Sequence, residues 1–229
     1  IQNGFVRVAA GRIIDVGQGR GACPEETVLP HGPGVLMPAL VNAHTHIDLC
    51  ALKGRTDLAS GFMGWVASVI RQKEILTPDE LEAEARLGVE TLKRFGTGIV
   101  GDISSIGLSD HLFLDSGLAG VRFQEFLGRQ PPSALRCEAV SDTQTLSVAG
   151  HGPHTTSPKL LAHLKAATRR ASTPFGLHLA ESPDEVEFLT CGKGPWADFL
   201  AERGIDTTDW GFTGLGPVRH ADGLGLLDP

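Results

Sequence analysis

The sequence predicts an α/β protein built on a parallel sheet covered by helices. From residue 35 onward, short apolar runs alternate with helix-like segments, as expected for repeated strand–helix units. The 229 residues are enough for one or two domains with a sizeable core. Apolar residues make up 41% of the chain, which argues against a disordered protein.

The first 34 residues are predicted to be a small β unit of their own. Two short strands, Phe5–Val8 and Ile13–Val16, flank Gly11-Arg12, which indicates a hairpin turn. The stretch that follows, up to residue 34, is rich in glycine and proline and predicts an irregular connection. The α/β domain then covers residues 35–229.

Apolar runs of strand length follow in the α/β domain, at residues 35–42, 97–103, 121–127, 146–149 and 175–179. Helix starts of one kind occur three times: Ser157-Pro158 and the two capping boxes Thr77-Pro78-Asp79-Glu80 and Ser182-Pro183-Asp184-Glu185. We count five strand–helix units, whereas a closed eight-fold barrel needs about 250 residues. The pattern therefore leaves open an incomplete barrel and a complete open sheet of five strands.

Charge and composition exclude several classes of function. A net charge of −7 and a pI near 5.7 argue against nucleic acid as a partner, because phosphate binding needs a basic face. No apolar run approaches the roughly 18 residues of a membrane span, and the first ten residues do not resemble a signal peptide. The expected partner is a small-molecule substrate, and a homo-oligomer is compatible with the sequence.

The cysteines point to a reducing compartment. Cys23, Cys50, Cys137 and Cys191 lie far apart and form no CxxC pair. This spacing argues against a disulfide framework and against a thiolate zinc site, and it fits the cytoplasm. We interpret Cys50, four residues beyond His46, as a buried, inert thiol.

The strongest chemical signal is the pair His44 and His46 at the end of the first predicted strand. Residues two apart on a strand point to the same face, so both imidazoles could reach one divalent ion. Neutral imidazole suits zinc, iron or nickel. Two solvent-facing loop histidines are the alternative, but the carboxyl end of a parallel strand is where α/β active sites form.

A second signal is His178, near the end of the run at residues 175–179, followed three residues later by Glu181. The histidine could complete a set of metal ligands. The carboxylate could take the proton of an activated water and deliver it to a leaving group without binding the metal. A glutamate that only complements a helix dipole is the alternative.

Further candidates follow other strands. His151 and His154 come after the run at residues 146–149, where one of them could polarise a substrate carbonyl or ring nitrogen, although turn chemistry around Gly-Pro explains them too. Trp65, with Phe62 and Ile70, could wall a flat substrate, but a core face is the commoner explanation.

Two groups of residues are interpreted as secondary. Glu125 stands in an otherwise apolar strand and needs a partner, near the site or at a helix dipole. The remaining histidines lack strand-end context and are interpreted as surface or satisfied side chains: His31, His111, His163 and His220.

Three segments together resemble signatures of the amidohydrolase superfamily. Residues 38–46, Pro-Ala-Leu-Val-Asn-Ala-His-Thr-His, resemble its "PGLVNAHTH" segment. Residues 151–155 look like "HAPYT" and residues 178–181 like "HLAE", in matching order and spacing. The similarity is to the chlorohydrolase-like and deaminase-like branch, which includes adenosine-type, S-adenosylhomocysteine, aminofutalosine, guanine and cytosine deaminases and triazine hydrolases.

The resemblance implies a partial, distorted TIM barrel and a composite β-sandwich built from both chain ends, to which residues 1–34 would contribute. It also implies one divalent metal, zinc first and iron second. The family's further metal-site His and Asp come from later strands, so we expect this chain to be incomplete at its C-terminus. Carried over by motif, the metal ligands are His44, His46 and His178, the proton shuttle is Glu181 and the substrate-binding histidine is His151, with His154 and Trp65 as further substrate contacts.

Two departures from the family pattern bear on the substrate. His154 stands where tyrosine is usual, and residues 62–66 lack the glutamate that binds ribose in nucleoside deaminases, which weakens the case for an adenosine-like substrate. The favoured function is metal-dependent hydrolytic deamination of a cyclic amidine or a purine- or pyrimidine-like ring. The alternatives are a triazine-type or cyclic-amide hydrolase with the same site, and a non-catalytic fragment that binds metal or a partner.

Overall fold

The structure, a computed structural model, describes residues 1–19, 21 and 25–228. The chain divides into two compact units, residues 1–38 and 39–229. Among the described residues, no helix is both long enough and apolar enough to cross a membrane.

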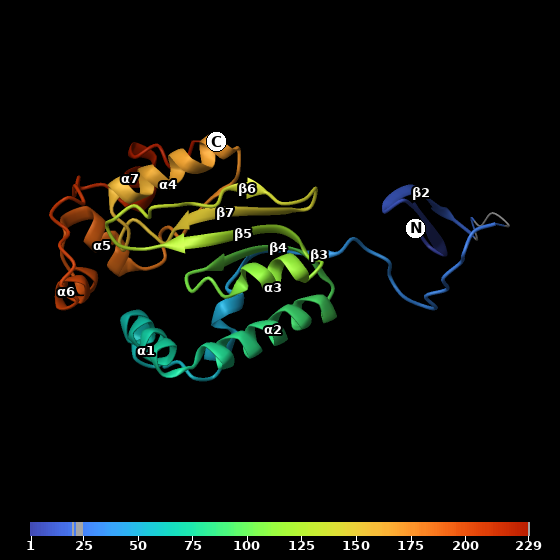
Figure 1. The fold of residues 1–229 in the computed structure, drawn as a ribbon, viewed down its shortest axis with the longest axis horizontal. Helices are drawn as coiled ribbons and strands as arrows, with labels where there is room; N and C mark the ends of the chain where they lie inside the picture. Colours follow the sequence, from blue (N-terminus) through green and yellow to red (C-terminus); the bar gives the residue numbers. More distant parts are fainter. Residues whose placement is uncertain (20, 22–24, 229) are drawn as a thin grey trace. The chain divides into compact units, whose positions relative to one another are not determined.

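The first unit holds an antiparallel hairpin of β1 (Gly4–Ala9) and β2 (Arg12–Gln18) (Figure 1). The predicted hairpin is therefore present, but its turn is Ala10-Gly11 and not Gly11-Arg12. Both turn residues have positive φ, 49° and 75°, which is the geometry of the two-residue turns that match the twist of a hairpin. Whether this hairpin belongs to a composite sandwich remains a prediction.

The second unit is built on a parallel sheet, and the five predicted parallel strands are confirmed. They are β3 (Leu40–Thr45), β4 (Thr97–Ser104), β5 (Ala119–Phe126), β7 (Gln144–Gly150) and β8 (Phe175–Leu177), each paired in parallel with the next. A two-residue strand that the sequence did not predict, β6 (Glu138–Ala139), pairs antiparallel with β7.

The first of these strands begins later than the apolar run predicted. Val35 and Met37 are exposed, and pairing with β4 begins only at Leu40, whose N–H donates to the Gly96 carbonyl at 2.9 Å. Pro38, just before, has no N–H to give to a sheet. The strand continues to Thr45, so that His44 lies within it and His46 just beyond it.

Helices cover the sheet and extend past its carboxyl edge. They are α1 (Gly61–Ile75), α2 (Pro78–Arg94), α3 (Ser109–Asp115), α4 (Pro158–Ala171), α5 (Pro183–Cys191), α6 (Pro195–Glu202) and α7 (Pro217–Gly223), with a 3-10 helix η1 (Ile47–Leu52). Figure 1 shows α2 and α3 along β4 and α4 along β7, with α5 and α6 beyond the carboxyl ends of β5 and β7.

The helix α2 illustrates how the covering helices are held. Its Leu81, Ala85 and Val89 recur at helical spacing and are buried, as the apolar period predicts. Ala85 and Val89 pack with Val100 of β4 and Phe113 of α3 in one core cluster. Burial of this stripe fixes the helix against the sheet.

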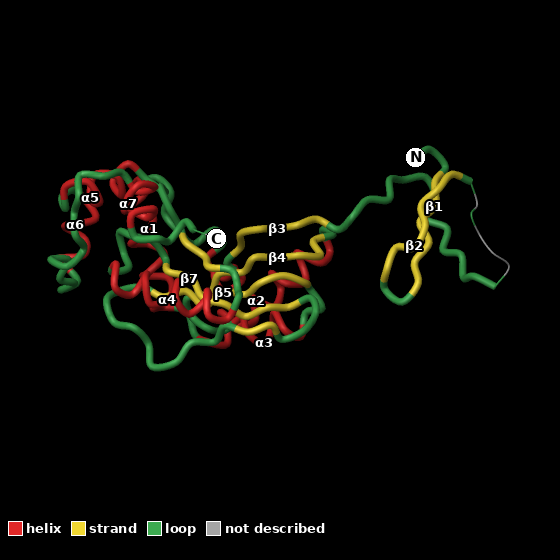
Figure 2. The backbone as a smooth tube through the Cα atoms, turned by 90° about the horizontal axis from the view of Figure 1, so that it is seen from above, coloured by secondary structure: helices red, strands yellow, loops and turns green. Residues whose placement is uncertain are grey.

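The sheet is strongly curled. The strands β3 and β8 are the first and last of the parallel series, yet the Nε2 atoms of His44 and His178 at their ends are only 3.2 Å apart. In a flat sheet four strand spacings would separate these strands by about 19 Å. Figure 2 accordingly shows β3 and β4 stepping out of the plane of β5 and β7. The curl brings side chains from both edges of the series to one point.

The described cysteines are unpaired, and Cys50 is half-buried, not fully buried as predicted. Cys50, Cys137 and Cys191 are free thiols. Burial raises the pKa of Cys50, which makes its thiol less reactive. Cys23 lies outside the described residues.

Candidate metal and hydrolytic site

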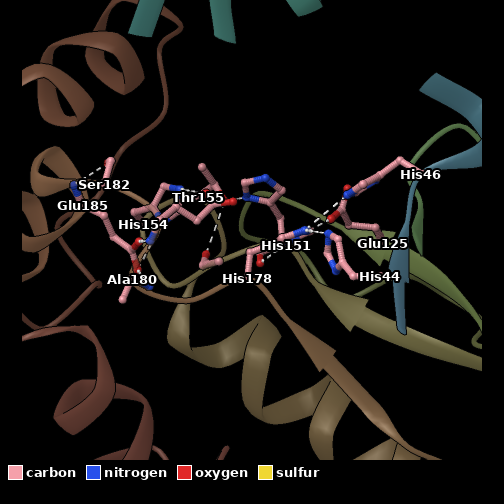
Figure 3. A network of polar contacts seen from close by, with 12 residues as sticks. His44, His46, Glu125, His151, His154, Thr155, His178, Ala180, Ser182 and Glu185 are labelled. Atoms are coloured by element: carbon pink, nitrogen blue, oxygen red, sulfur yellow. Dashed lines mark hydrogen bonds and ion pairs between the residues drawn. The ribbon is translucent and has the colours of Figure 1, made fainter. Parts of the chain in front are cut away.

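Three imidazoles meet where the curled sheet brings the strand ends together. His44 and His46 come from the end of β3, and His178 comes one residue after β8. The Nε2 atom of His178 lies 3.2 Å from Nε2 of His44 and 3.3 Å from Nε2 of His46 (Figure 3). The structure therefore brings the three predicted metal ligands to one point.

The spacing of these nitrogens fits a shared ion. Two nitrogens that each bind one zinc at about 2.0–2.1 Å in tetrahedral geometry are about 3.3–3.4 Å apart. Burial lowers the pKa of both His44 and His46, and the charge of His178 lowers them further. Both rings are therefore neutral at neutral pH, which is the form that binds a divalent ion.

Glu125 of β5 orients the third imidazole. Its Oε1 atom lies 3.3 Å from Nδ1 of His178, and the carbonyl oxygen of His151 lies 3.2 Å from the same nitrogen. Burial opposes the charged form of His178, but the Glu125 carboxylate outweighs it and raises the pKa. The raised pKa favours the imidazolium, so an ion at Nε2 would have to replace the proton there, while Nδ1 keeps its proton between Glu125 and the His151 carbonyl. This contact supplies the partner that the sequence required for Glu125.

His151 lies beside this cluster, one residue beyond β7. Its ring centre is 4.9 Å from that of His178, and its Nδ1 is 2.7 Å from the hydroxyl of Thr155. Burial lowers the pKa of His151 to about 4, so the ring is neutral at pH 7 and offers one donor and one acceptor nitrogen.

Glu181 lies outside the trio of histidines. Its carboxylate groups instead with His151 and His154, with ligand atoms within 4.8 Å of one another, and the side chain is 25% exposed. Burial raises the pKa of Glu181, and the nearby Glu185 carboxylate adds to the effect. A carboxylate with a raised pKa and partial exposure beside a metal-type cluster is suited to proton transfer.

His154 is completely buried and lies between two carboxylates. Its Nε2 is 3.6 Å from Oε2 of Glu181, and its Nδ1 is 3.7 Å from Oε1 of Glu185. The ring of Trp196 packs 4.5 Å away. Within the described residues neither ring nitrogen has a hydrogen-bond partner. Its predicted part as a substrate contact stays a prediction.

Trp65 lies on α1, and its ring centre is 5.7 Å from that of Phe62. Phe62 in turn is 6.3 Å from Trp196 and packs, with Met63 and Val66, on the core cluster around that indole. The structure therefore joins Trp65 to this cluster through Phe62.

The family of this chain is shown by its sequence. The amidohydrolase family profile matches residues 35–194, more than half of the chain. This chain belongs to the amidohydrolase family.

A relative of this amidohydrolase is the 5-methylthioadenosine/S-adenosylhomocysteine deaminase of Nitratidesulfovibrio vulgaris, 29% identical over 252 residues. The match covers 100% of this chain and 51% of that protein. The amidohydrolase chain thus spans about half the length of this curated relative.

Two solved structures share the fold. The aminofutalosine deaminase of Helicobacter pylori, in complex with methylthio-coformycin, matches with a TM-score of 0.61 and 23% identity, over 71% of this chain and 42% of that one. The atrazine chlorohydrolase of Arthrobacter aurescens, complexed with zinc, matches with a TM-score of 0.70 and 14% identity, over 96% of this chain and 53% of that one.

The role predicted for Glu185 from the sequence is wrong in one respect. Glu185 was predicted to close a capping box, and the Ser182 hydroxyl does accept the Glu185 N–H at 3.2 Å. The Glu185 side chain, however, is completely buried and accepts the N–H groups of Ala180 and Glu181. No signal within these four residues distinguishes this arrangement from a complete capping box.

His220 also differs from its prediction. The side chain was interpreted as exposed or satisfied, but it is 5% exposed on α7, and its Nε2 has no hydrogen-bond partner in the described part of the chain. Burial lowers its pKa, so the ring is held neutral. Ala221, the next residue of α7, packs with Leu161 of α4 and with Leu226, which lies beyond the helix. This packing holds α7 against the core and buries His220 with it.

Proposed function

We propose that this chain carries the metal-binding half of a hydrolytic deaminase that acts on an amino-substituted ring, such as a cyclic amidine, purine or pyrimidine. The observation that carries the proposal is the meeting of three Nε2 atoms, from His44, His46 and His178, at the spacing of ligands to one ion. The deaminase names of the N. vulgaris and H. pylori proteins support this class of reaction.

The proposed cofactor is one divalent ion, zinc before iron, held by these three histidines. Neutral imidazoles suit either ion, and the atrazine chlorohydrolase structure is a zinc complex. When bound, such an ion supplies a water acidic enough to lose a proton near neutral pH. Glu125 would keep His178 in the tautomer that binding requires.

The remaining chemistry is assigned to the chain's own groups. Glu181 takes a proton from the attacking water while the oxygen of that water bonds to the amidine carbon. Glu181 then returns the proton to the amine nitrogen as the C–N bond breaks and ammonia leaves. The proton of the remaining hydroxyl passes to the ring nitrogen, which gives the ring carbonyl. His151, neutral and half-buried beside Glu181, steadies the polar ring atom next to the reacting carbon. The proposed roles of His154 and Trp65 as substrate contacts rest on the sequence alone.

The wider assignments are proposals of the same kind. We propose that the curled sheet is the first five strands of a distorted TIM barrel and that residues 1–34 contribute to a composite sandwich. The whole protein is proposed to act on a small molecule in the cytoplasm. Neither nucleic acid nor a membrane is proposed as a partner, and a homo-oligomer is compatible with the proposal. The same site could serve a triazine-type or cyclic-amide hydrolase, which releases a different product.

The test is product release by the natural full-length protein on a panel of amino-substituted rings. Ammonia release is expected, and Glu181→Gln should reduce turnover by about 10²–10⁴-fold while metal content stays unchanged. Glu187→Gln, the same change on the exposed side of α5, is the matched control and should leave turnover intact. Full turnover in Glu181→Gln would remove that residue from the mechanism, and loss of metal would make it a ligand.

A further inference from the structure

The carboxylate of Glu185 is completely buried, and the proposed chemistry gives it no task. A charge removed from water is unfavourable unless hydrogen bonds replace its hydration. Here Oε1 accepts the N–H of Ala180 at 3.1 Å and Oε2 accepts the N–H of Glu181 at 2.6 Å. Each oxygen therefore holds one of two successive amides, directly at the residue proposed to carry the proton.

The backbone at this point has an unusual conformation. Ala180 has a φ of 60°, in the left-handed region that residues with a Cβ seldom adopt. A turn of this kind can direct successive N–H groups to one side, where they form a concave site for an anion. The Glu185 carboxylate occupies that site. It therefore stabilises the backbone turn from which the Glu181 side chain projects.

A second link joins the same two glutamates. The His154 ring lies between them, 3.6 Å from the Glu181 carboxylate and 3.7 Å from that of Glu185. Its loop is anchored because the indole Nε1 of Trp210 donates to the carbonyl of Pro153 at 2.7 Å. Gly152 allows the fit, since a Cβ there would come within 2.7 Å of the imidazole.

From these contacts we propose that Glu185 is a positioning residue for Glu181. It fixes the backbone turn that carries Glu181 through two amides, with the His154 ring packed between the two carboxylates. The inference deepens the proposed function, on which it rests for the role of Glu181 in proton transfer; the turn itself depends on no substrate. Its first test therefore measures the backbone alone.

The first test is amide hydrogen exchange in the natural full-length protein. Glu185→Gln keeps the size of the side chain but leaves only one acceptor oxygen. The side-chain NH2 of the glutamine would face the second backbone N–H and could not accept its hydrogen bond. Exchange at residues 180 and 181 should become several-fold faster, while α2 is unchanged. The control Glu187→Gln should exchange as wild type does. Unchanged exchange in Glu185→Gln would overturn the proposal, whatever the protein catalyses.

The second test separates positioning from general loss of structure. Glu185→Gln should lower kcat by about 10–100-fold with KM and metal content unchanged. In a Glu181→Gln background the same change should have no further effect on kcat, because its target is already gone. A further loss in that background, or a parallel loss of metal, would overturn the positioning role.

Failure of the proposed function and failure of the Glu185 role give different results. A wild-type protein that releases ammonia from no ring would count against the proposed function, while the exchange result still decides the role of Glu185. If Glu185→Gln does not fold, Glu185→Asp replaces it, since it keeps both oxygens but withdraws them by one methylene. Faster exchange at residues 180 and 181 in Glu185→Asp supports the proposal, and wild-type exchange overturns it.

Discussion

The starts of α2 and α5 are nearly the same four residues, and the structure uses them differently. Thr77-Pro78-Asp79-Glu80 begins one helix and Ser182-Pro183-Asp184-Glu185 begins the other. In both, the first hydroxyl accepts the N–H of the glutamate, at 3.3 Å and 3.2 Å. Glu80 is exposed and turns back to the N–H of Thr77 at 2.9 Å, whereas Glu185 is buried and holds the two amides before its own cap.

The difference shows which part of a helix start is local. The hydroxyl bond and the proline at the first helical position depend only on neighbouring residues, so they recur in both places. Which N–H groups the glutamate carboxylate accepts depends on the residues packed against it. Around Glu185 these neighbours are His154, from a loop about 30 residues earlier, and the left-handed turn at Ala180 just before the helix.

The largest expected effect comes from removing each glutamate side chain. Glu185→Ala leaves two amide donors without their acceptor and should lower the free energy of unfolding by about 2–4 kcal/mol. Glu80→Ala leaves donors at an exposed helix end, where water replaces the lost acceptor, so the loss should be clearly smaller. Urea unfolding of both variants measures the comparison. Equal losses would mean that burial does not distinguish the two sites.

The pH dependence of stability should be the next largest difference. Burial of Glu185 opposes its charge, but His154 and the two amides outweigh burial and lower its pKa. Its stabilisation is complete above the pKa of an unfolded glutamate, about 4.3, and is lost as pH falls through the lower pKa of the folded state. The unfolding free energies of wild type and Glu185→Gln should therefore converge on acidification.

Salt sharpens the same measurement. The Thr77 N–H and hydroxyl lower the pKa of Glu80 as well, but that carboxylate is in water. Added salt should weaken the contribution of Glu80 and leave that of Glu185 nearly unchanged. A contribution from Glu185 that salt removes would contradict its burial.

The smallest effect tests what the two helix starts share. Thr77→Ala and Ser182→Ala each remove one cap acceptor and should each lower stability by about 1 kcal/mol. Thermal unfolding should place the two variants within a few tenths of a kcal/mol of each other. A much larger loss for Ser182→Ala would show that its hydroxyl takes part in holding the Glu181 turn.

Much of the fold was predictable because it follows from local pattern. Alternating apolar runs located all five parallel strands, and the two-residue spacing of His44 and His46 placed both rings on one side of a strand. The start of β3 was predicted too early because Val35 and Met37 look like strand residues but remain exposed. The strand β6 is too short for any period to reveal.

The candidate site was predictable only where strand ends carry it. His151 and His178 each follow a strand by one residue, so the parallel topology gathers them with the pair on β3. The burial of His154 depends on Trp196, from a helix more than 40 residues later, and the part taken by Glu185 depends on a backbone turn. Neither is encoded in the neighbouring sequence.

The distance along the chain between the clustered histidines has a consequence for folding. His46 and His178 are 132 positions apart, and the second of them is placed only when β8 joins β7. Long-range pairing of this kind is slow, because the entropy of closing the intervening loop is lost before the contacts are gained. On a ribosome the first two imidazoles emerge early, but the chain must reach β8 before any ion could be shared. An ion bound there would connect the first and last of these strands. It would slow unfolding and leave the rate of folding unchanged.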